Sequence, residues 1–139
     1  MRIAIIGSGG REHAICQKIL ESKKVKKIYC IPGNGGTQKI VENIDIKLNN
    51  FDKIKFFLLE KRIDLTIIGP EEPLVNGITD YLRINNLKVF GPDKFCSKLE
   101  GSKIFTKKIC KIKKIPTAKF EIFNNIKVCL QYLKNKKYP

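Results

Sequence analysis

The sequence has no tryptophan, only one histidine, and five cysteines that form no C-x-x-C pair. His13 is the only histidine, and a single histidine gives no basis for predicting a Ser-His-Asp or a Cys-His catalytic arrangement. No group of side chains has the spacing of a metal site, so we expect neither catalytic residues of these kinds nor metal ligands within the chain. Unpaired cysteines in mostly apolar surroundings are typical of reduced core residues in a cytosolic protein.

Long hydrophobic runs are also missing. The first apolar segment is interrupted at Gly7 and again at Arg11, which makes it too short for the apolar region of a signal peptide. No other segment approaches the roughly 18 consecutive apolar residues of a membrane span. We therefore expect a cytoplasmic protein with no membrane partner.

Acidic residues are scarce, because 28 Lys and Arg stand against 13 Asp and Glu, for a net charge of +15. Residues 1–100 hold 17 basic and 12 acidic side chains, whereas residues 101–139 hold 11 lysines and only one acidic residue, Glu121. Arginine and interleaved exposed aromatics, which nucleic-acid binding favours, are lacking in this basic segment. We expect no specific nucleic-acid partner, and a polyanion-binding tail stays open as an alternative.

What the sequence does have is a glycine cluster directly after a short apolar strand. Arg2 to Gly7 is followed by Ser8-Gly9-Gly10 and then by a helical pattern that starts near Arg11. Glycines let backbone N–H groups approach an anion, and the positive end of the helix dipole points at the same place. The segment predicts a phosphate site, although a tight turn without a ligand would need the same glycines.

This loop does not match a dinucleotide fingerprint. The pattern G-x-G-x-x-G requires glycine at position 12, where Glu12 stands. The second predicted strand ends in Pro32-Gly33-Asn34 instead of the acidic residue that holds a ribose. The sequence therefore argues against NAD as the ligand.

Apolar strand-like runs alternate with amphipathic helices over residues 1–100. This rhythm predicts an α/β fold: a small doubly wound parallel sheet of five strands, Rossmann-like, with residues 42–48 as its short third strand. One helix is expected to carry Leu74, Ile78, Tyr81 and Leu82 on its apolar side. From Gly101 on, a Lys-rich helix, a strand near 117–123 and a last helix cannot complete a second domain.

Three of the predicted strands end in glycine-rich or Gly-Pro turns. Ligands of such sheets bind at the carboxyl ends of the strands, where these turns meet. The turns are Gly7-Ser8-Gly9-Gly10, Pro32-Gly33-Asn34-Gly35-Gly36-Thr37 and Gly69-Pro70-Glu71-Glu72-Pro73. We expect them to bring Arg11, Glu12, Asn34, Thr37 and Glu71 to one polar pocket.

Several motifs together closely resemble phosphoribosylamine-glycine ligases, which belong to the ATP-grasp superfamily. They are G-S-G-G-R-E-H-A (7–14), P-G-N-G-G-T (32–37), I-D-L-T-I-I-G-P-E-E-P-L-V-N-G (63–77), F-G-P (90–92), L-E-G-S-K-I-F-T-K (99–107) and I-P-T-A (115–118). The resemblance extends over essentially the whole chain. It implies a pre-ATP-grasp domain in residues 1–100 that binds phosphoribosylamine, and the incomplete start of an ATP-grasp domain in residues 101–139.

The resemblance implies an enzyme of purine synthesis that joins glycine to 5-phosphoribosylamine while ATP is cleaved to ADP and phosphate. Gly9, Gly10, Arg11 and Glu12 would line the sugar-phosphate pocket. Asn34 and Thr37 would close the pocket, Glu71 would hydrogen-bond the ribose or its amine, and Lys103 would contact ATP phosphate. The complete enzyme would use ATP with Mg²⁺ or Mn²⁺.

The chain is shorter than the family pattern, since the glycine-rich ATP loop, the acidic metal ligands and the C-terminal domain have no counterpart in it. Phosphoryl transfer depends on positioning and on metal neutralisation of the γ-phosphate. We therefore expect the 139 residues by themselves to be inactive. The alternatives are a phosphosugar- or nucleotide-binding module without catalysis, and a polyanion-binding protein.

Overall fold

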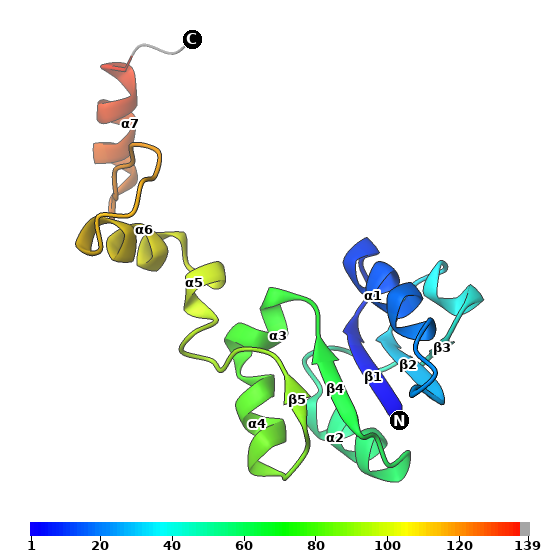
Figure 1. Ribbon diagram of the computed structural model, residues 1–139. Helices are drawn as coiled ribbons and strands as arrows, with labels where there is room; N and C mark the ends of the chain where they lie inside the picture. The colour runs from blue at the N-terminus through cyan, green and yellow to red at the C-terminus, as the bar shows by residue number, and fades with distance from the viewer. Residues whose placement is uncertain (137–139) are drawn as a thin grey trace. The chain divides into compact units, whose positions relative to one another are not determined.

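The computed structural model describes residues 1–136 and divides the chain into two compact units, Met1–Gly101 and the residues from Ser102 on, which are described separately. The first unit contains a sheet of five parallel strands in the order β3-β2-β1-β4-β5 (Figure 1). The strands are β1 (Arg2–Gly7), β2 (Lys27–Pro32), β3 (Glu42–Asn43), β4 (Leu65–Ile68) and β5 (Val89–Phe90). The expected parallel α/β sheet is thus confirmed.

Helices connect these strands, and one more follows the last strand. In the first unit they are α1 (Gly10–Leu20), the 3-10 helix η1 (Thr37–Lys39), α2 (Phe51–Glu60), α3 (Glu71–Asn76), α4 (Ile78–Ile84) and α5 (Lys98–Gly101). Asn50 begins α2 as its N-cap, because its side-chain oxygen accepts a hydrogen bond from the Lys53 N–H at 3.0 Å. Within residues 1–136, no helix combines the length and the apolar character that crossing a membrane requires.

The two faces of the sheet are both covered, because successive strand residues point to opposite sides. Ile3 and Ile5 of β1 pack with Cys16 of α1 on one face. Ala4 and Ile6 pack on the other face, where α2, α3 and α4 contribute the rest of the core. The core residues of those helices are Ile54, Phe57, Leu58, Leu74, Ile78 and Leu82. Helices on both faces of a parallel sheet make the unit doubly wound.

The strand order places a topological switch point between β1 and β4. The chain moves outward from β1 to β2 and β3, and then returns through α2 to the opposite side of β1. Loops that leave adjacent strands in opposite directions open a crevice at their carboxyl ends, where ligands of such folds bind. The turns after β1 and β4 flank this crevice.

Two predicted elements of the first unit differ in the structure. The third strand is limited to Glu42–Asn43, which pair with Tyr29 and Cys30 of β2. Beyond it the chain leaves the sheet, and Ile44, Ile46 and Leu48 pack against the core instead. The single helix expected around Leu74 to Leu82 is broken by Gly77, whose φ of +95° ends α3 in the left-handed conformation.

The second unit contains α6 (Lys103–Ile112) and α7 (Ile126–Lys134). Ser102 and Asn125 cap them through side-chain oxygens that accept backbone N–H groups of Phe105 and Lys127. The strand expected near 117–123 is wrong, since the described chain from 115 to 123 has no regular secondary structure. A strand needs a neighbour for its backbone hydrogen bonds, and the unit offers none in its described part. No residue from 102 to 136 is buried.

Candidate functional site

The three glycine-containing turns lie side by side at the carboxyl edge of the sheet. The Gly33 N–H donates to the Gly7 carbonyl at 3.1 Å, and the Gly69 N–H donates to the Ile6 carbonyl at 3.0 Å. These bonds continue the β2-β1 and β1-β4 ladders into the turns. The turns meet at one edge, as expected, because the strands that precede them are parallel.

The second turn is held by hydrogen bonds of Asn34, Thr37 and Asn43. The Asn34 side-chain oxygen accepts from the N–H groups of Gly36 and Thr37 at 2.7 and 2.9 Å. The Thr37 hydroxyl donates to the Asn34 carbonyl at 2.9 Å and lies 2.8 Å from the Asn43 side-chain oxygen. Asn43 in turn donates to the Asn34 carbonyl at 2.9 Å. Asn34 and Thr37 therefore shape the turn by holding its backbone.

Asn43 was not identified from the sequence, where it is one polar residue in a short predicted strand. Its side chain lies against the turn so closely that a Cβ at Gly33 would be 2.3 Å from it. Gly33 also has a φ of +76°, which favours glycine. No sequence spacing signals this contact, because it depends on how β3 pairs with β2.

Asn34 also joins the second turn to the first. Its side-chain amide donates to the carbonyls of Ser8 and Gly9 at 2.8 and 3.2 Å. His13 of α1 approaches the second turn as well, since a Cβ at Gly36 would lie 2.9 Å from the His13 Nδ1. The two turns are therefore fixed to each other before any ligand is present.

Glu12 lies beneath the first turn and not at the surface of a pocket. Its side chain is 3% exposed, and its Oε2 accepts the Gly9 N–H at 2.6 Å, as in a capping box. The Glu12 carboxylate thus already accepts the Gly9 N–H, and the predicted roles of Gly9 and Glu12 toward a phosphosugar stay predictions. Glu12 Oε1 has no hydrogen-bond partner in residues 1–136.

Arg11 lies at the mouth of the crevice between two carboxylates. Its Nε is 3.5 Å from Glu12 Oε1, and one of its terminal nitrogens is 3.5 Å from Glu71 Oε2. The Arg11 and Glu71 side chains are 56% and 54% exposed, so their mutual attraction is weak and both are accessible to a ligand. The structure thus brings Arg11, Glu12 and Glu71 together.

Lys103, the remaining predicted ligand residue, is the first residue of α6 in the second unit. Its side chain is exposed. The predicted contact between Lys103 and ATP phosphate stays a prediction. Among residues 1–136, no three His, Cys, Asp or Glu side chains are grouped so that they could hold a metal ion.

The cysteines occupy different environments. Cys16 and Cys30 are fully buried between α1 and the sheet, and Cys30 Sγ donates to the Gly7 carbonyl at 3.5 Å. A hydrogen bond to Cys30 and burial together raise the pKa of Cys16, so this thiol stays protonated. The expected core role is wrong for Cys96, which is exposed, and Cys110 and Cys129 are only half-buried.

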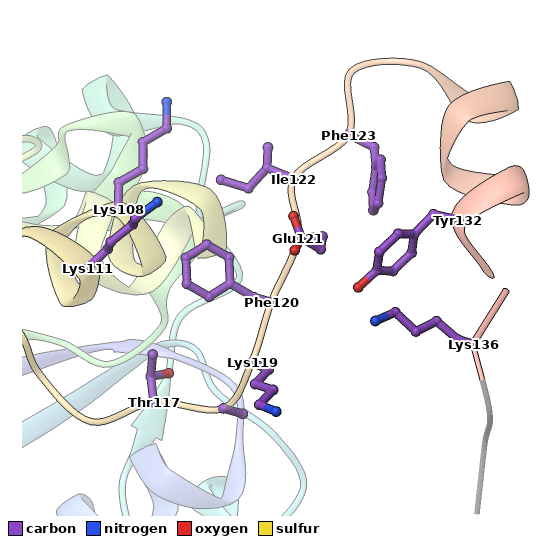
Figure 2. A pocket seen from close by; sticks show the side chains of 11 residues that line it. Lys108, Lys111, Thr117, Lys119, Phe120, Glu121, Ile122, Phe123, Tyr132 and Lys136 are labelled. Carbon is purple, nitrogen blue, oxygen red and sulfur yellow. The ribbon is translucent and has the colours of Figure 1, made fainter.

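A cavity of about 830 Å³ lies within the second unit, and none of the predicted site residues lines it. Figure 2 shows Lys108 and Lys111 on one side of it and Tyr132 and Lys136 on the other, with the segment around Phe120 between them. Its cations suit an anion in general. No buried polar group in the described lining fixes a particular ligand.

Comparison with known proteins identifies the family of the chain. Residues 1–100 match the family model of the phosphoribosylglycinamide synthetase N domain. The chain belongs to this family. Its whole length is 45% identical to a phosphoribosylamine-glycine ligase of Caldanaerobacter subterraneus and covers 33% of that protein. It is 41% identical to the Escherichia coli ligase of the same name, again over all of the chain and 33% of the relative.

Solved structures show the same relationship. A phosphoribosylamine-glycine ligase from Thermotoga maritima matches 99% of this chain and 31% of its own, with a TM-score of 0.66 and 27% identity. An N5-carboxyaminoimidazole ribonucleotide synthetase from the same organism matches 94% of this chain with a TM-score of 0.69, and at 17% identity it shows the fold alone. The chain spans about a third of the length of the curated relatives that it matches.

Proposed function

We propose that this chain supplies the phosphoribosylamine-binding part of a ligase that joins glycine to 5-phosphoribosylamine, with ATP cleaved to ADP and phosphate. The observation that carries the proposal is the gathering of three turns at the carboxyl edge of the sheet, two of them joined by Asn34, with Arg11 at the mouth of the crevice beside Glu71. The 45% identity to a ligase of this name supports the choice of reaction.

We propose that the phosphate binds at the first turn of α1. The N–H groups of Gly10 and Arg11 follow the Gly9 N-cap, and an anion there would gain from the positive end of the helix dipole. The half-exposed Arg11 guanidinium would add charge-assisted hydrogen bonds. Gly9 would contribute only through the conformation of its backbone, because its own N–H already donates a hydrogen bond to the Glu12 carboxylate.

The sugar would lie toward the third turn. Glu71 is the first residue of α3 and is half-exposed beside Arg11, so its carboxylate can accept hydrogen bonds from the ribose hydroxyls or the amine. Asn34 and Thr37 would close the pocket by holding the second turn in place. Glu12 would act from beneath the loop, through Gly9 and Arg11.

The ATP-dependent step would need groups other than those of the three turns. Lys103 is the candidate for contact with ATP phosphate, and the ligands of Mg²⁺ or Mn²⁺ would come from other parts of such a ligase, since residues 1–136 offer no group of that kind. The metal would neutralise the charge of the γ-phosphate. For the 139 residues by themselves we propose ligand binding without turnover.

Calorimetric titration with ribose 5-phosphate tests the proposed site. Arg11→Ala should weaken binding by roughly 1.5–3 kcal/mol, the range for a lost charged hydrogen bond, with little loss of stability. Lys23→Ala is the matched control, because it removes one positive charge from an exposed position in the loop after α1. Equal affinity of the parent protein and Arg11→Ala would contradict the assignment of the phosphate to this turn.

A further inference from the structure

Glu12 stands where a G-x-G-x-x-G loop has its third glycine, since Gly7 and Gly9 supply the first two. In dinucleotide-binding units, the second glycine lets the pyrophosphate approach the backbone and the third lets the helix pack closely on the strand. Here β1 ends at Gly7, Gly9 is the N-cap of α1, and the sheet has the order of such a unit. The loop therefore has the frame of a dinucleotide site with a carboxylate added.

The added side chain fills the base of the crevice between β1 and β4, beneath the first turn. A Cβ at Gly7 would lie 2.6 Å from Glu12 Cγ, and one at Gly69 would lie 2.0 Å from Glu12 Oε1. At Gly9 a Cβ would be 2.9 Å from Glu12 Oε2. All three backbones thus lie close to the same side chain, and its Oε2 already accepts the Gly9 N–H, which a pyrophosphate approaching the second glycine would need.

The carboxylate also brings charge into the crevice. Glu12 is 3% exposed, and its Oε1 makes no hydrogen bond in the described part of the chain, with Arg11 Nε the nearest cation at 3.5 Å. A buried anion repels a second anion strongly, because little water screens the pair. A pyrophosphate would therefore meet both the volume and the charge of Glu12.

We propose that Glu12 determines the ligand class of this site. Its side chain closes the crevice to nucleotides that carry a pyrophosphate and leaves the mouth beside Arg11 for the single phosphate of a sugar monophosphate. The choice of a monophosphate rests on the proposed function, whereas the exclusion of the pyrophosphate does not. Glu12 is a positioning residue in this scheme, since it acts through the space it fills and through Arg11.

The test compares binding of NAD and of ribose 5-phosphate by calorimetry in the parent protein and in variants at position 12. Glu12→Ala and Glu12→Gly open the crevice and should bind NAD about tenfold more tightly than the parent. The gain is limited because β2 is not followed by an acidic residue for the adenosine ribose. Glu12→Gln removes the charge but keeps the volume, so its gain should be clearly smaller than that of the two small variants.

Glu21→Ala is the matched control. It removes the same charge at the other end of α1, where Glu21 is an exposed partner of Lys18, and should leave NAD binding unchanged. Circular dichroism and thermal unfolding establish that each variant is folded.

Folded Glu12→Ala and Glu12→Gly proteins that bind NAD no better than the parent would overturn the proposal. A tenfold gain in Glu12→Gln would also overturn it, since volume would then not be the barrier; this variant is nearly isosteric and keeps the test valid if the smaller ones do not fold. A parent protein that fails to bind ribose 5-phosphate would contradict the proposed function alone. A gain in NAD binding by the small variants would still support the exclusion.

Discussion

Helices α1 and α6 have similar lengths, and α6 is the more strongly amphipathic of the two, but only α1 is part of a core. Ile15, Cys16 and Ile19 of α1 pack against β1 and β2. Phe105 and Ile109 of α6 are only half-buried, and Ile112 is 71% exposed. An amphipathic pattern thus specifies which face of a helix can be buried, whereas burial requires a complementary surface.

Net charge differs between the two units to which these helices belong. In residues 1–100, 12 acidic side chains offset most of the 17 basic ones, whereas residues 101–139 carry 11 lysines and one acidic residue. Self-repulsion of this kind disfavours a compact state unless apolar burial offsets it. The described part of the second unit therefore has little to hold it together in isolation.

The largest expected difference is in amide hydrogen exchange. Amides of β1 should exchange only when the first unit unfolds, whereas those of α6 and α7 open locally at little cost. For a domain stability of at least 5 kcal/mol, this predicts protection in β1 about 10³-fold greater or more. Exchange measured by NMR or mass spectrometry provides the comparison, and limited proteolysis should leave a core that ends near residues 100–114.

Equal protection in α7 and β1 would show that the second unit is as stable as the first. The comparison between the two regions would then be wrong, whatever the exposure of the α7 side chains.

The next largest difference between the two units should appear when a leucine side chain is truncated to alanine. Leu58 of α2 is fully buried, so Leu58→Ala should lower the free energy of unfolding by about 2–5 kcal/mol. Leu130 of α7 is 52% exposed, and the same change there should cost less than about 0.5 kcal/mol. Urea unfolding followed by circular dichroism measures both, and a loss at Leu130 as large as that at Leu58 would refute the difference in packing.

A smaller effect is expected on ligand binding at the third turn of the first unit. Glu71→Gln should weaken binding of ribose 5-phosphate by about 1 kcal/mol while changing binding of inorganic phosphate less, because Glu71 would contact the sugar. Glu72→Gln is the matched control, since both glutamates are exposed in the first turn of α3. Equal effects of Glu71→Gln on both ligands would remove Glu71 from the sugar-facing role.

The smallest effect concerns pH. A hydrogen bond from the Tyr81 hydroxyl, followed in importance by Lys55, lowers the pKa of Asp52 and links α2 to α4. A lowered folded-state pKa stabilises the protein above the unfolded value of about 3.9, and this contribution is lost as pH falls through the folded-state pKa. Asp52→Asn should therefore be slightly less stable than the parent at pH 7, with the difference fading below about pH 4.

Thermal unfolding between pH 3 and pH 7 measures this difference. Tyr81→Phe should reproduce most of it, because it removes the first cause of the shift. A difference that stays constant across this range would rule out the Asp52 carboxylate as its source.

The strands and turns of the first unit could be predicted because their signals are local. The apolar run before Gly7 becomes β1, and Gly69 follows β4 as expected. Parallel strands bring their carboxyl ends to one edge, so Arg11, Glu12 and Glu71 could be expected to meet there. Their roles toward a ligand stay predictions.

The incorrect predictions have two origins, a missing partner strand and a local break of a helix. Residues 117–123 have the composition of a strand but find no partner strand, and Gly77 ends a helix whose apolar spacing continues through it. The position of Asn43 against Gly33 depends on two residues of pairing between β3 and β2.

The sequence by itself determined the parallel α/β fold, the positions of the three turns and the absence of a third glycine at position 12. Only the tertiary structure decided that the Glu12 carboxylate lies beneath the loop, bonds the Gly9 N–H and fills the space beside Gly69. Periodicity and turn chemistry act within a few residues, so they are readable in sequence. The direction of a side chain in a crevice depends on backbones about 57 positions apart, which only the folded sheet brings together.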